Sequence, residues 1–344
     1  MKSILQLVSI SFLSVCITNI SAQAAGRQYP AVGDRESSPD VLLHEDFENG
    51  WGKWDYPQAD TQFLFLENDN DIAHSGSGVL RSTITREDLT KKPYIASKAR
   101  YVFSKPVDSI YWRFYTRFNP DSPTPHHWVK LAATNGIFDV RGKAGVKPGG
   151  DEAMWFDIDI NNNDLFSFFV YWHEMRSGRC NDGSSTPGCK GDQGQTYYYG
   201  NKFKPAGQLS MRRDEWSCIE IHAKLNDVGK SNGELSLWID DELIGNYYKG
   251  TPSGTWLRAR FHSDGCDFSD CYPPEPFDGF NFRTSEKVQF REIYMAAYYQ
   301  LDSFDRKKEK LKKMGKNVSH NQTIYYDDII VATERIGCMS SDKK

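Results

Sequence analysis

The chain has 344 residues, of which 39% are hydrophobic and 14% aromatic, and it contains 27 Gly and 15 Pro. This composition can bury a core, which excludes a disordered protein, and it favours a chain rich in strands and turns. The formal net charge of −4 excludes the strongly basic class of nucleic-acid-binding proteins.

Residues 1–24 have the pattern of a secretory signal peptide. Lys2 precedes an apolar stretch over 4–17, and Ala22 and Ala24 supply the small residues of a cleavage site. The apolar stretch is short for a membrane span, and no later segment is apolar enough to cross one. We therefore expect a secreted protein, extracellular or periplasmic, without membrane association. Residues 25–40 would form a flexible leader.

Six cysteines remain once the signal peptide is removed: Cys180, Cys189, Cys218, Cys266, Cys271 and Cys338. An even number in an exported chain predicts disulfides, although six cysteines allow 15 pairings. Closeness in the chain favours Cys180–Cys189 and Cys266–Cys271, which leaves Cys218 for Cys338. No CxxC pair is present, which disfavours a zinc site.

Short β-like runs alternate with turn clusters from Val41 onward. The runs cover 109–118, 128–133, 154–160, 165–173, 216–225, 234–239, 256–262, 288–299 and 323–332. Many evenly spaced strands without intervening helical patterns predict a sandwich or barrel.

One segment, 305–316, breaks this pattern because it is rich in Lys and compatible with a helix. Charge runs usually face water, so a solvated excursion is the plain interpretation. The alternative is a basic lip that attracts an anionic polymer.

Alternation along the strands locates the candidate site, because residues i, i+2 and i+4 of a strand share one face. Five rows of polar, aromatic or cationic residues result: Arg113, Tyr115 and Arg117; His126, Trp128 and Lys130; Asp157, Asp159 and Asn161; Phe169, Tyr171 and His173; Arg258, Arg260 and His262. Five such rows together predict a long groove for a charged saccharide rather than an ordinary wet sheet face.

Glycoside hydrolysis uses two carboxyl groups that flank the bond, and laminarinase-type sandwich hydrolases have Glu-x-Asp-x-x-Glu on one strand. Here Asp157 replaces the first Glu, and neither Asn161 nor Asn162 supplies the last. Elimination from a uronate polymer instead needs a neutralised carboxylate, a base for the C5 proton and an acid for the departing O4. We predict that the catalytic residues are Tyr171, His173, Arg117, Lys130 and His126. We predict that the substrate-binding residues are Arg113, Arg176, Trp128, Arg258, Arg260 and Tyr197. An adjacent Arg would favour the phenolate of Tyr171 as base, and no catalytic cofactor is expected.

Several motifs resemble those of the jelly-roll polysaccharide lyases, with fungal glucuronan lyases and bacterial concanavalin-like relatives as the nearest likeness. They are DFENGW at 46–51, HSGSG at 74–78, WSCIEIH at 216–222, LWID at 237–240, YDDI at 326–329 and ATERIGC at 332–338, with HHWVK at 126–130 and YWHE at 171–174 closest to the bacterial branch. The resemblance covers 41–338 and leaves 339–344 as a tail. It implies an all-β jelly-roll sandwich of two antiparallel sheets, concanavalin A-like in topology.

The resemblance also implies a structural calcium ion that joins the two chain ends. By motif position, its ligands would be Glu48, the Ser75 carbonyl and Asp327, and hard oxygen ligands suit Ca²⁺. This chain has Gly78 where the fungal motif has an Asn ligand. The resemblance further supports a Cys218–Cys338 disulfide.

Together these patterns predict a monomeric, secreted lyase that cleaves an anionic, uronate-containing polysaccharide by β-elimination. Two other classes remain open. The chain could be a carbohydrate-binding module without catalysis, or a lectin-like adhesion domain that recognises a protein, because jelly rolls host many functions.

Overall fold

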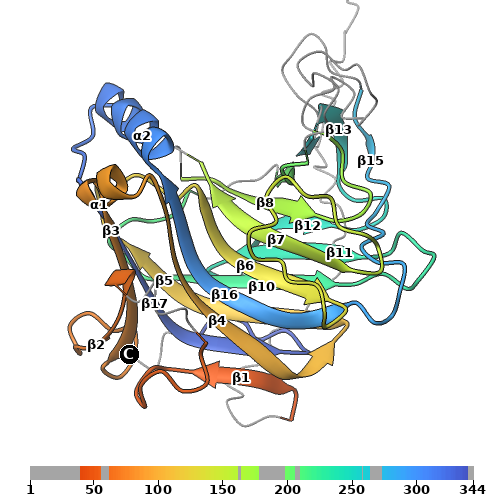
Figure 1. The fold of residues 1–344 in the computed structure, drawn as a ribbon, viewed down its shortest axis with the longest axis horizontal. Helices are drawn as coiled ribbons and strands as arrows, with labels where there is room; N and C mark the ends of the chain where they lie inside the picture. The colour runs from red at the N-terminus through yellow and green to blue at the C-terminus, as the bar shows by residue number, and fades with distance from the viewer. Residues whose placement is uncertain are drawn as a thin grey trace, which may run out of the picture.

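The computed structural model describes residues 39–55, 62–161, 164–177, 198–205, 210–257, 259–263 and 273–339. Within these residues, two large sheets pack face to face (Figure 1). The eight-stranded sheet has the order β12 (Glu242–Tyr247), β11 (Glu234–Ile239), β10 (Ser217–Lys224), β5 (Ser109–Phe118), β17 (Asn321–Ala332), β3 (Gly78–Thr85) and β2 (Leu64–Asn68), with β1 (Val41–Glu45) paired to β17.

The nine-stranded sheet has the order β15 (Glu275–Pro276), β13 (Ser253–Leu257), β14 (Arg260–Ser263), β9 (Asn201–Lys204), β8 (Phe166–Tyr171), β7 (Ala153–Ile160), β6 (His127–Thr134), β16 (Gln289–Gln300) and β4 (Tyr94–Val107). All of its described pairs are antiparallel except β14 with β9, which is parallel. The prediction of a jelly-roll sandwich is confirmed.

The strands predicted over 109–118 and 234–239 coincide with β5 and β11. The single strand predicted over 256–262 is wrong, because the chain reverses there and β13 pairs with β14. Trp256 then faces Phe261 across the hairpin. The aromatic pattern runs through both arms, and it concealed the turn between them.

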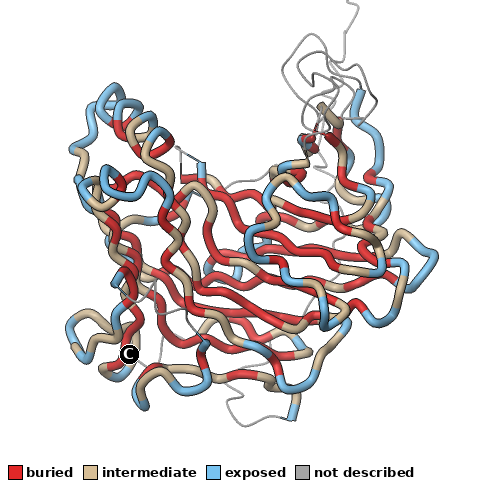
Figure 2. The backbone as a smooth tube through the Cα atoms, viewed as in Figure 1, coloured by how far each residue is buried: buried red, intermediate tan, exposed pale blue. Residues whose placement is uncertain are grey.

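A core rich in aromatic side chains lies between the sheets. Figure 2 shows the buried segments of the strands that contribute to it. Trp128 is part of this core, with an exposed fraction of 1%. Its indole Nε1 donates a hydrogen bond to the Tyr326 hydroxyl at 2.8 Å. The Trp128 ring is therefore enclosed between the two sheets, which leaves little of its surface for the substrate binding predicted from the sequence.

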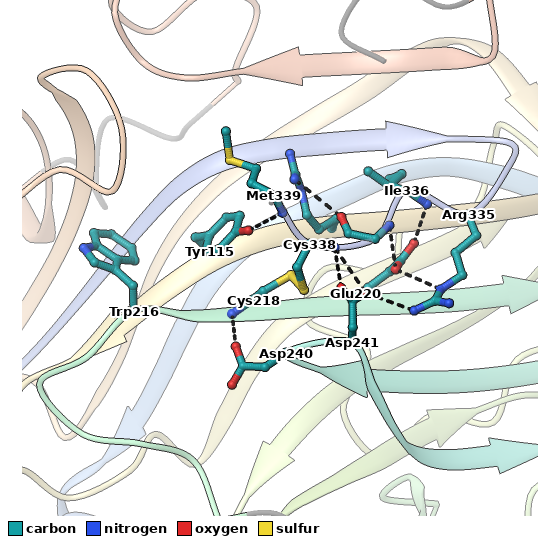
Figure 3. The surroundings of a disulfide bond; sticks show 12 residues. Tyr115, Trp216, Cys218, Glu220, Asp240, Asp241, Arg335, Ile336, Cys338 and Met339 are labelled. Carbon is teal, nitrogen blue, oxygen red and sulfur yellow. Dashed lines mark hydrogen bonds and ion pairs between the residues drawn. A yellow bond between two sulfur atoms is a disulfide. The ribbon is translucent and has the colours of Figure 1, made fainter. Parts of the chain in front are cut away.

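The C-terminal segment is fastened to the outer face of the eight-stranded sheet (Figure 3). A disulfide joins Cys218 of β10 to Cys338 and confirms that predicted bridge. The buried Glu220 carboxylate accepts hydrogen bonds from the backbone N–H groups of Ile336 and Gly337. The other four cysteines, Cys180, Cys189, Cys266 and Cys271, lie outside the described residues.

The Lys-rich segment forms helix α2 (Leu301–Lys313), which follows β16 and lies beside the short helix α1 (Arg86–Lys91) (Figure 1). Asp305 of α2 forms a bidentate ion pair with Arg86 of α1. Lys307 donates to the backbone carbonyls of Thr124 and Pro125, directly before β6. Most of the segment is therefore helical, which agrees with its helix-compatible sequence, and it is bound to the body of the domain. No helix in the described part of the chain is long and apolar enough to cross a membrane.

Candidate active site

Two adjoining cavities lie over the outer face of the nine-stranded sheet. The larger has a volume of about 730 Å³ and is lined by β7, β8, β9 and β14 residues among others. The smaller has a volume of about 300 Å³ and lies towards β4, β6 and β16. His127, Ala144, Tyr171 and Tyr298 line both cavities, so these residues mark the junction. We call the pair of cavities the groove.

A cross-strand row of side chains forms the groove floor. Successive Cα partners across β6, β7, β8, β9 and β14 are Lys130, Asp157, Phe169, Lys202 and Arg260. Neighbouring strands are about 4.8 Å apart, so this row spans about 19 Å. Each of these side chains stands on the face of the sheet opposite the core. The central strands can therefore carry charged residues without burying them in the core.

Asp159 of β7 organises the junction. Its Oδ1 lies 2.8 Å from His127 Nδ1, and its Oδ2 accepts from Lys202 Nζ at 2.7 Å. Burial acts to raise the pKa of this carboxyl, but Lys202 and His127 outweigh burial and hold the pKa well below its usual range. Because a carboxylate can only accept, His127 Nδ1 carries its hydrogen and Nε2 is the basic nitrogen of the neutral ring.

Aromatic rings fix the His127 imidazole. Phe169 stacks against it with ring centroids 4.7 Å apart, and Tyr298 lies nearly parallel at 5.9 Å. The ring therefore has little rotational freedom, and its position is set by packing as well as by Asp159.

Tyr171 stands at the end of β8, where its ring stacks on Trp155 with centroids 4.5 Å apart. Burial and the neighbouring carboxylates of Asp157 and Asp159 raise the pKa of its hydroxyl strongly. Tyr171 is therefore a neutral phenol at neutral pH. This raised pKa disfavours the predicted phenolate base, because burial and the charges of Asp157 and Asp159 act on the hydroxyl where an Arg was expected.

Two further titratable groups line the groove. Lys130 Nζ lies 3.4 Å from Oδ1 of Asp157, whose pKa is raised by burial. His126 lines the larger cavity. Its pKa is lowered to about 4, mainly by burial and next by the adjacent His127. His126 is therefore uncharged at neutral pH.

Cations outnumber carboxylates in the groove. The carboxylates among its described lining residues are Asp157 and Asp159, and the Lys and Arg side chains are Lys98, Lys130, Arg141, Lys143, Lys202 and Arg260. A concave surface with this balance attracts anions and concentrates them near the sheet. It can therefore hold a polymer that carries carboxylates.

The predicted residues that line the groove are Tyr171, Lys130, His126, Arg260 and Trp128, although the Trp128 ring is buried. The groove does not include His173. Strand β8 ends at Tyr171, so alternation no longer applies two residues later. His173 lies in a turn with its Nε2 3.6 Å from Oε1 of Glu174, and it lines neither cavity.

Arg113 and Arg117 belong to β5, in the other sheet, and their predicted roles in the groove are wrong. Arg113 is buried below the C-terminal segment, with its guanidinium 5.3 Å from the Tyr115 ring. Arg117 pairs with Asp214 at 2.8 Å. Alternation shows which residues share a face of a strand, but it does not show which sheet contains the strand.

One of the remaining predicted binding residues is described, and it lies outside the groove. Arg176 stacks over the Trp256 ring at 4.3 Å and lines neither cavity. Arg258 and Tyr197 lie outside the residues whose side chains are described.

Sequence reasoning assigned no role to His127 or Lys202. Strict alternation put His127 on the face opposite Lys130, but both side chains reach the groove while Trp128 between them enters the core. The pairing of β6 with β16 shifts register between Tyr294 and Ala297, which breaks the period of two. The signal that could have pointed to His127 and Lys202 is Asp159, which lies in an apolar run of the sequence. A carboxylate buried in such a strand needs cationic partners.

The residues expected to bind calcium meet at the turn over 74–78. Glu48 accepts from the N–H groups of Ser77 and Gly78, and Asp327 accepts from those of His74 and Ser75. Their donor chemistry fits a hard cation such as calcium. No three His, Cys, Asp or Glu side chains in the described ranges are grouped to hold a metal ion, so a site here would depend on the Ser75 carbonyl and water.

The structure explains why this chain has Gly78 where the fungal motif has Asn. A Cβ atom there would lie 2.5 Å from the carbonyl carbon of Phe47. The backbone of residues 47–48 therefore lies too close to Gly78 for any side chain at this position.

Comparison with solved structures identifies proteins of the same fold. A PL-14 alginate lyase from Aplysia kurodai matches with a TM-score of 0.50 and 11% identity over 85% of this chain and 99% of that one. An alginate lyase from Chlorella virus gives the same values. An endo-β-1,4-glucuronan lyase from Trichoderma reesei matches with a TM-score of 0.47 and 15% identity over 85% and 95%.

At this level of identity the likeness establishes the fold, and it confirms the resemblance to jelly-roll polysaccharide lyases at that level. No protein-family model and no curated protein matches the chain.

Proposed function

We propose that this protein is a polysaccharide lyase that cleaves a uronate-containing polymer by β-elimination. The observation that carries the proposal is the junction of the groove, where a fixed imidazole and a neutral phenol stand among cations. The fold shared with the alginate lyases supports the same reaction class.

The reaction breaks the C5–H and C4–O4 bonds and forms a C4–C5 double bond. Nε2 of His127 takes the C5 proton as general base, since Asp159 holds the opposite nitrogen. The Tyr171 hydroxyl gives its proton to the departing O4 as general acid, because its raised pKa keeps it protonated. Solvent then restores both groups.

The substrate carboxylate must be neutralised, because this acidifies the C5 proton and stabilises the charge that develops in the transition state. Lys202 and Lys130 are the cations of the floor nearest this junction, on the two sides of Phe169 in the cross-strand row. Each is held by a carboxylate, Asp159 or Asp157, and is thereby preorganised.

The test is to incubate the protein with a panel of uronate polymers and to follow the ultraviolet absorbance of the unsaturated product. His127→Ala should lower turnover by about 10²–10⁴-fold, the usual contribution of a general base. His173→Ala is the matched control and should keep most of the activity. A wild-type protein that binds polymers without forming product would support the carbohydrate-binding module instead.

We also propose that the domain is exported and binds calcium. Export is supported by the signal-like segment 1–24 and the Cys218–Cys338 disulfide. Calcium binding is supported by the oxygen-rich turn over 74–78, where Glu48, the Ser75 carbonyl and Asp327 would hold the ion. The ion would stabilise the fold by linking the two chain ends, away from the groove.

A further inference from the structure

The floor of the groove continues beyond the junction as a patch of positive charge on β9 and β14. Phe203 and Phe261 point into the core from these strands. Lys202 and Lys204 flank Phe203, and Arg260 and His262 flank Phe261. These four residues therefore share the opposite face of the sheet, which is the face of the groove. Lys202 is the Cα partner of Arg260, and Lys204 is the partner of His262.

These cations differ in how their charge is compensated. Lys202 is paired with Asp159. In contrast, no carboxylate among the residues that the structure describes forms an ion pair with Lys204 or Arg260. An uncompensated pair of cations on neighbouring strands is costly unless an anion joins it.

The electrostatics agree with this geometry. The pKa of Lys204 is lowered by burial first, and then by Arg260 and Lys202. The pKa of His262 is lowered by burial, Lys204 and Arg260. Each of these groups therefore experiences a positive potential from the others.

We propose that Lys204 and Arg260 form a second anion subsite, which binds a carboxylate or sulfate group on a sugar other than the one being cleaved. The proposal rests on the proposed function for its polymer substrate. Lys204 lies two residues along β9 from Lys202, about 6.6 Å, so an anion at Lys204 belongs to another sugar unit. The preferred polymer then carries negative charge on more than one sugar around the cleaved bond.

Lys204→Gln tests this subsite because it removes the charge and keeps a polar side chain. Lys105→Gln, at an exposed position of β4, is the matched control. Three polymers serve as probes: one of contiguous uronates, one in which uronates alternate with neutral sugars, and one in which they alternate with sulfated sugars. The first and third carry the extra anion, as carboxylate and as sulfate respectively.

For the contiguous and sulfated polymers, Lys204→Gln should raise KM about tenfold, the size expected for one lost charge-assisted hydrogen bond, with kcat nearly unchanged. For the alternating neutral polymer the KM should not change. A response to only one of the two charged polymers would identify the anion as carboxylate or as sulfate. An equal effect on all three polymers, or no effect on any, would overturn the proposal.

A binding measurement distinguishes failure of this subsite from failure of the proposed lyase reaction. Calorimetry at several salt concentrations measures the affinity for uncleaved polymers of the Tyr171→Phe protein, with and without Lys204→Gln. Lys204→Gln should weaken binding of the charged polymers and flatten its salt dependence, since one screened contact is lost. If the wild-type protein cleaves no polymer but Lys204→Gln still weakens binding, the subsite is supported and the proposed lyase reaction is refuted. Equal affinities of the proteins with and without Lys204→Gln would refute the subsite.

Discussion

His127 and Asp159 form a dyad across β6 and β7, with Nδ1 of the imidazole 2.8 Å from Oδ1 of the buried carboxylate. The same carboxylate binds Lys202 through its other oxygen. One side chain therefore sets the tautomer of the proposed base and the position of a cation that lines the groove. This arrangement makes Asp159 the central residue of the candidate site.

Asp159→Asn should lower turnover by about 10²–10⁴-fold, because an amide has one acceptor oxygen and cannot accept from both His127 Nδ1 and Lys202 Nζ. Steady-state kinetics on the best polymer measures this effect. Asp214→Asn, which breaks the pair with Arg117 on the other sheet, is the control and should leave kinetics unchanged. Equal activities of the two variants would contradict the role of Asp159.

Tyr171→Phe should keep the stacking on Trp155 and the affinity for polymer, because only a hydroxyl is removed. Turnover should fall by about 10²–10⁴-fold, the contribution typical of general acid catalysis. Tyr101→Phe, a half-buried tyrosine of β4 outside both cavities, is the matched control. Near-full turnover of Tyr171→Phe would show that another group protonates O4.

The lowered pKa of His126 predicts that the stability of the protein depends on pH. Its pKa is about 4 in the folded protein, mainly because of burial, and 6.5 is the ordinary value. Between these values the unfolded chain binds more protons than the folded one, so the free energy of unfolding falls as the pH drops from 6.5 to 4. Denaturant unfolding over this pH range measures the slope, which should be shallower in His126→Gln. A His126 NMR titration near 6.5 would contradict the prediction.

Calcium removal should lower the melting temperature more than it lowers activity at a permissive temperature. A ligand that binds only the folded state adds about 2.7 kcal/mol at a concentration 100 times its Kd. Thermal melts with and without chelator measure the shift, and Glu48→Gln should reduce it. An unchanged melting temperature in chelator would exclude a structural calcium ion.

The Cys218–Cys338 disulfide should stabilise the fold by constraining the unfolded chain. It closes a loop with a sequence separation of 120, for which the chain-entropy model predicts about 4–5 kcal/mol. Denaturant unfolding of a Cys218→Ser, Cys338→Ser double variant measures the loss. Alkylation of the wild-type protein without reduction should label neither cysteine, and labelling of either would contradict the bridge.

Local patterns in the sequence predicted several strands and a sandwich or barrel, and the motif resemblance narrowed this to a jelly roll. The run over 109–118 alternates large apolar residues with polar and aromatic ones, and the structure has β5 over the same residues. The Lys-rich segment 305–316 overlaps the helix that the structure has at 301–313. The Cys218–Cys338 bridge followed from the even cysteine count together with the motif resemblance.

The site was predictable only in part. Alternation selected Tyr171, Lys130, His126, Arg260 and Trp128, and all five line the groove. The prediction failed for Arg113 and His173 for two different reasons. Arg113 lies in a strand of the other sheet, and His173 lies beyond the end of its strand.

Tertiary structure decided which strands are neighbours, and with them the chemistry of the site. His127 meets Asp159, 32 residues away, only because β6 and β7 pair in the same sheet and the irregular register of β6 turns Trp128 inward. A period of two is a local property of the backbone, whereas sheet membership and register shifts arise from long-range pairing. The sequence therefore determined which faces carry charge, and the fold determined which charges meet.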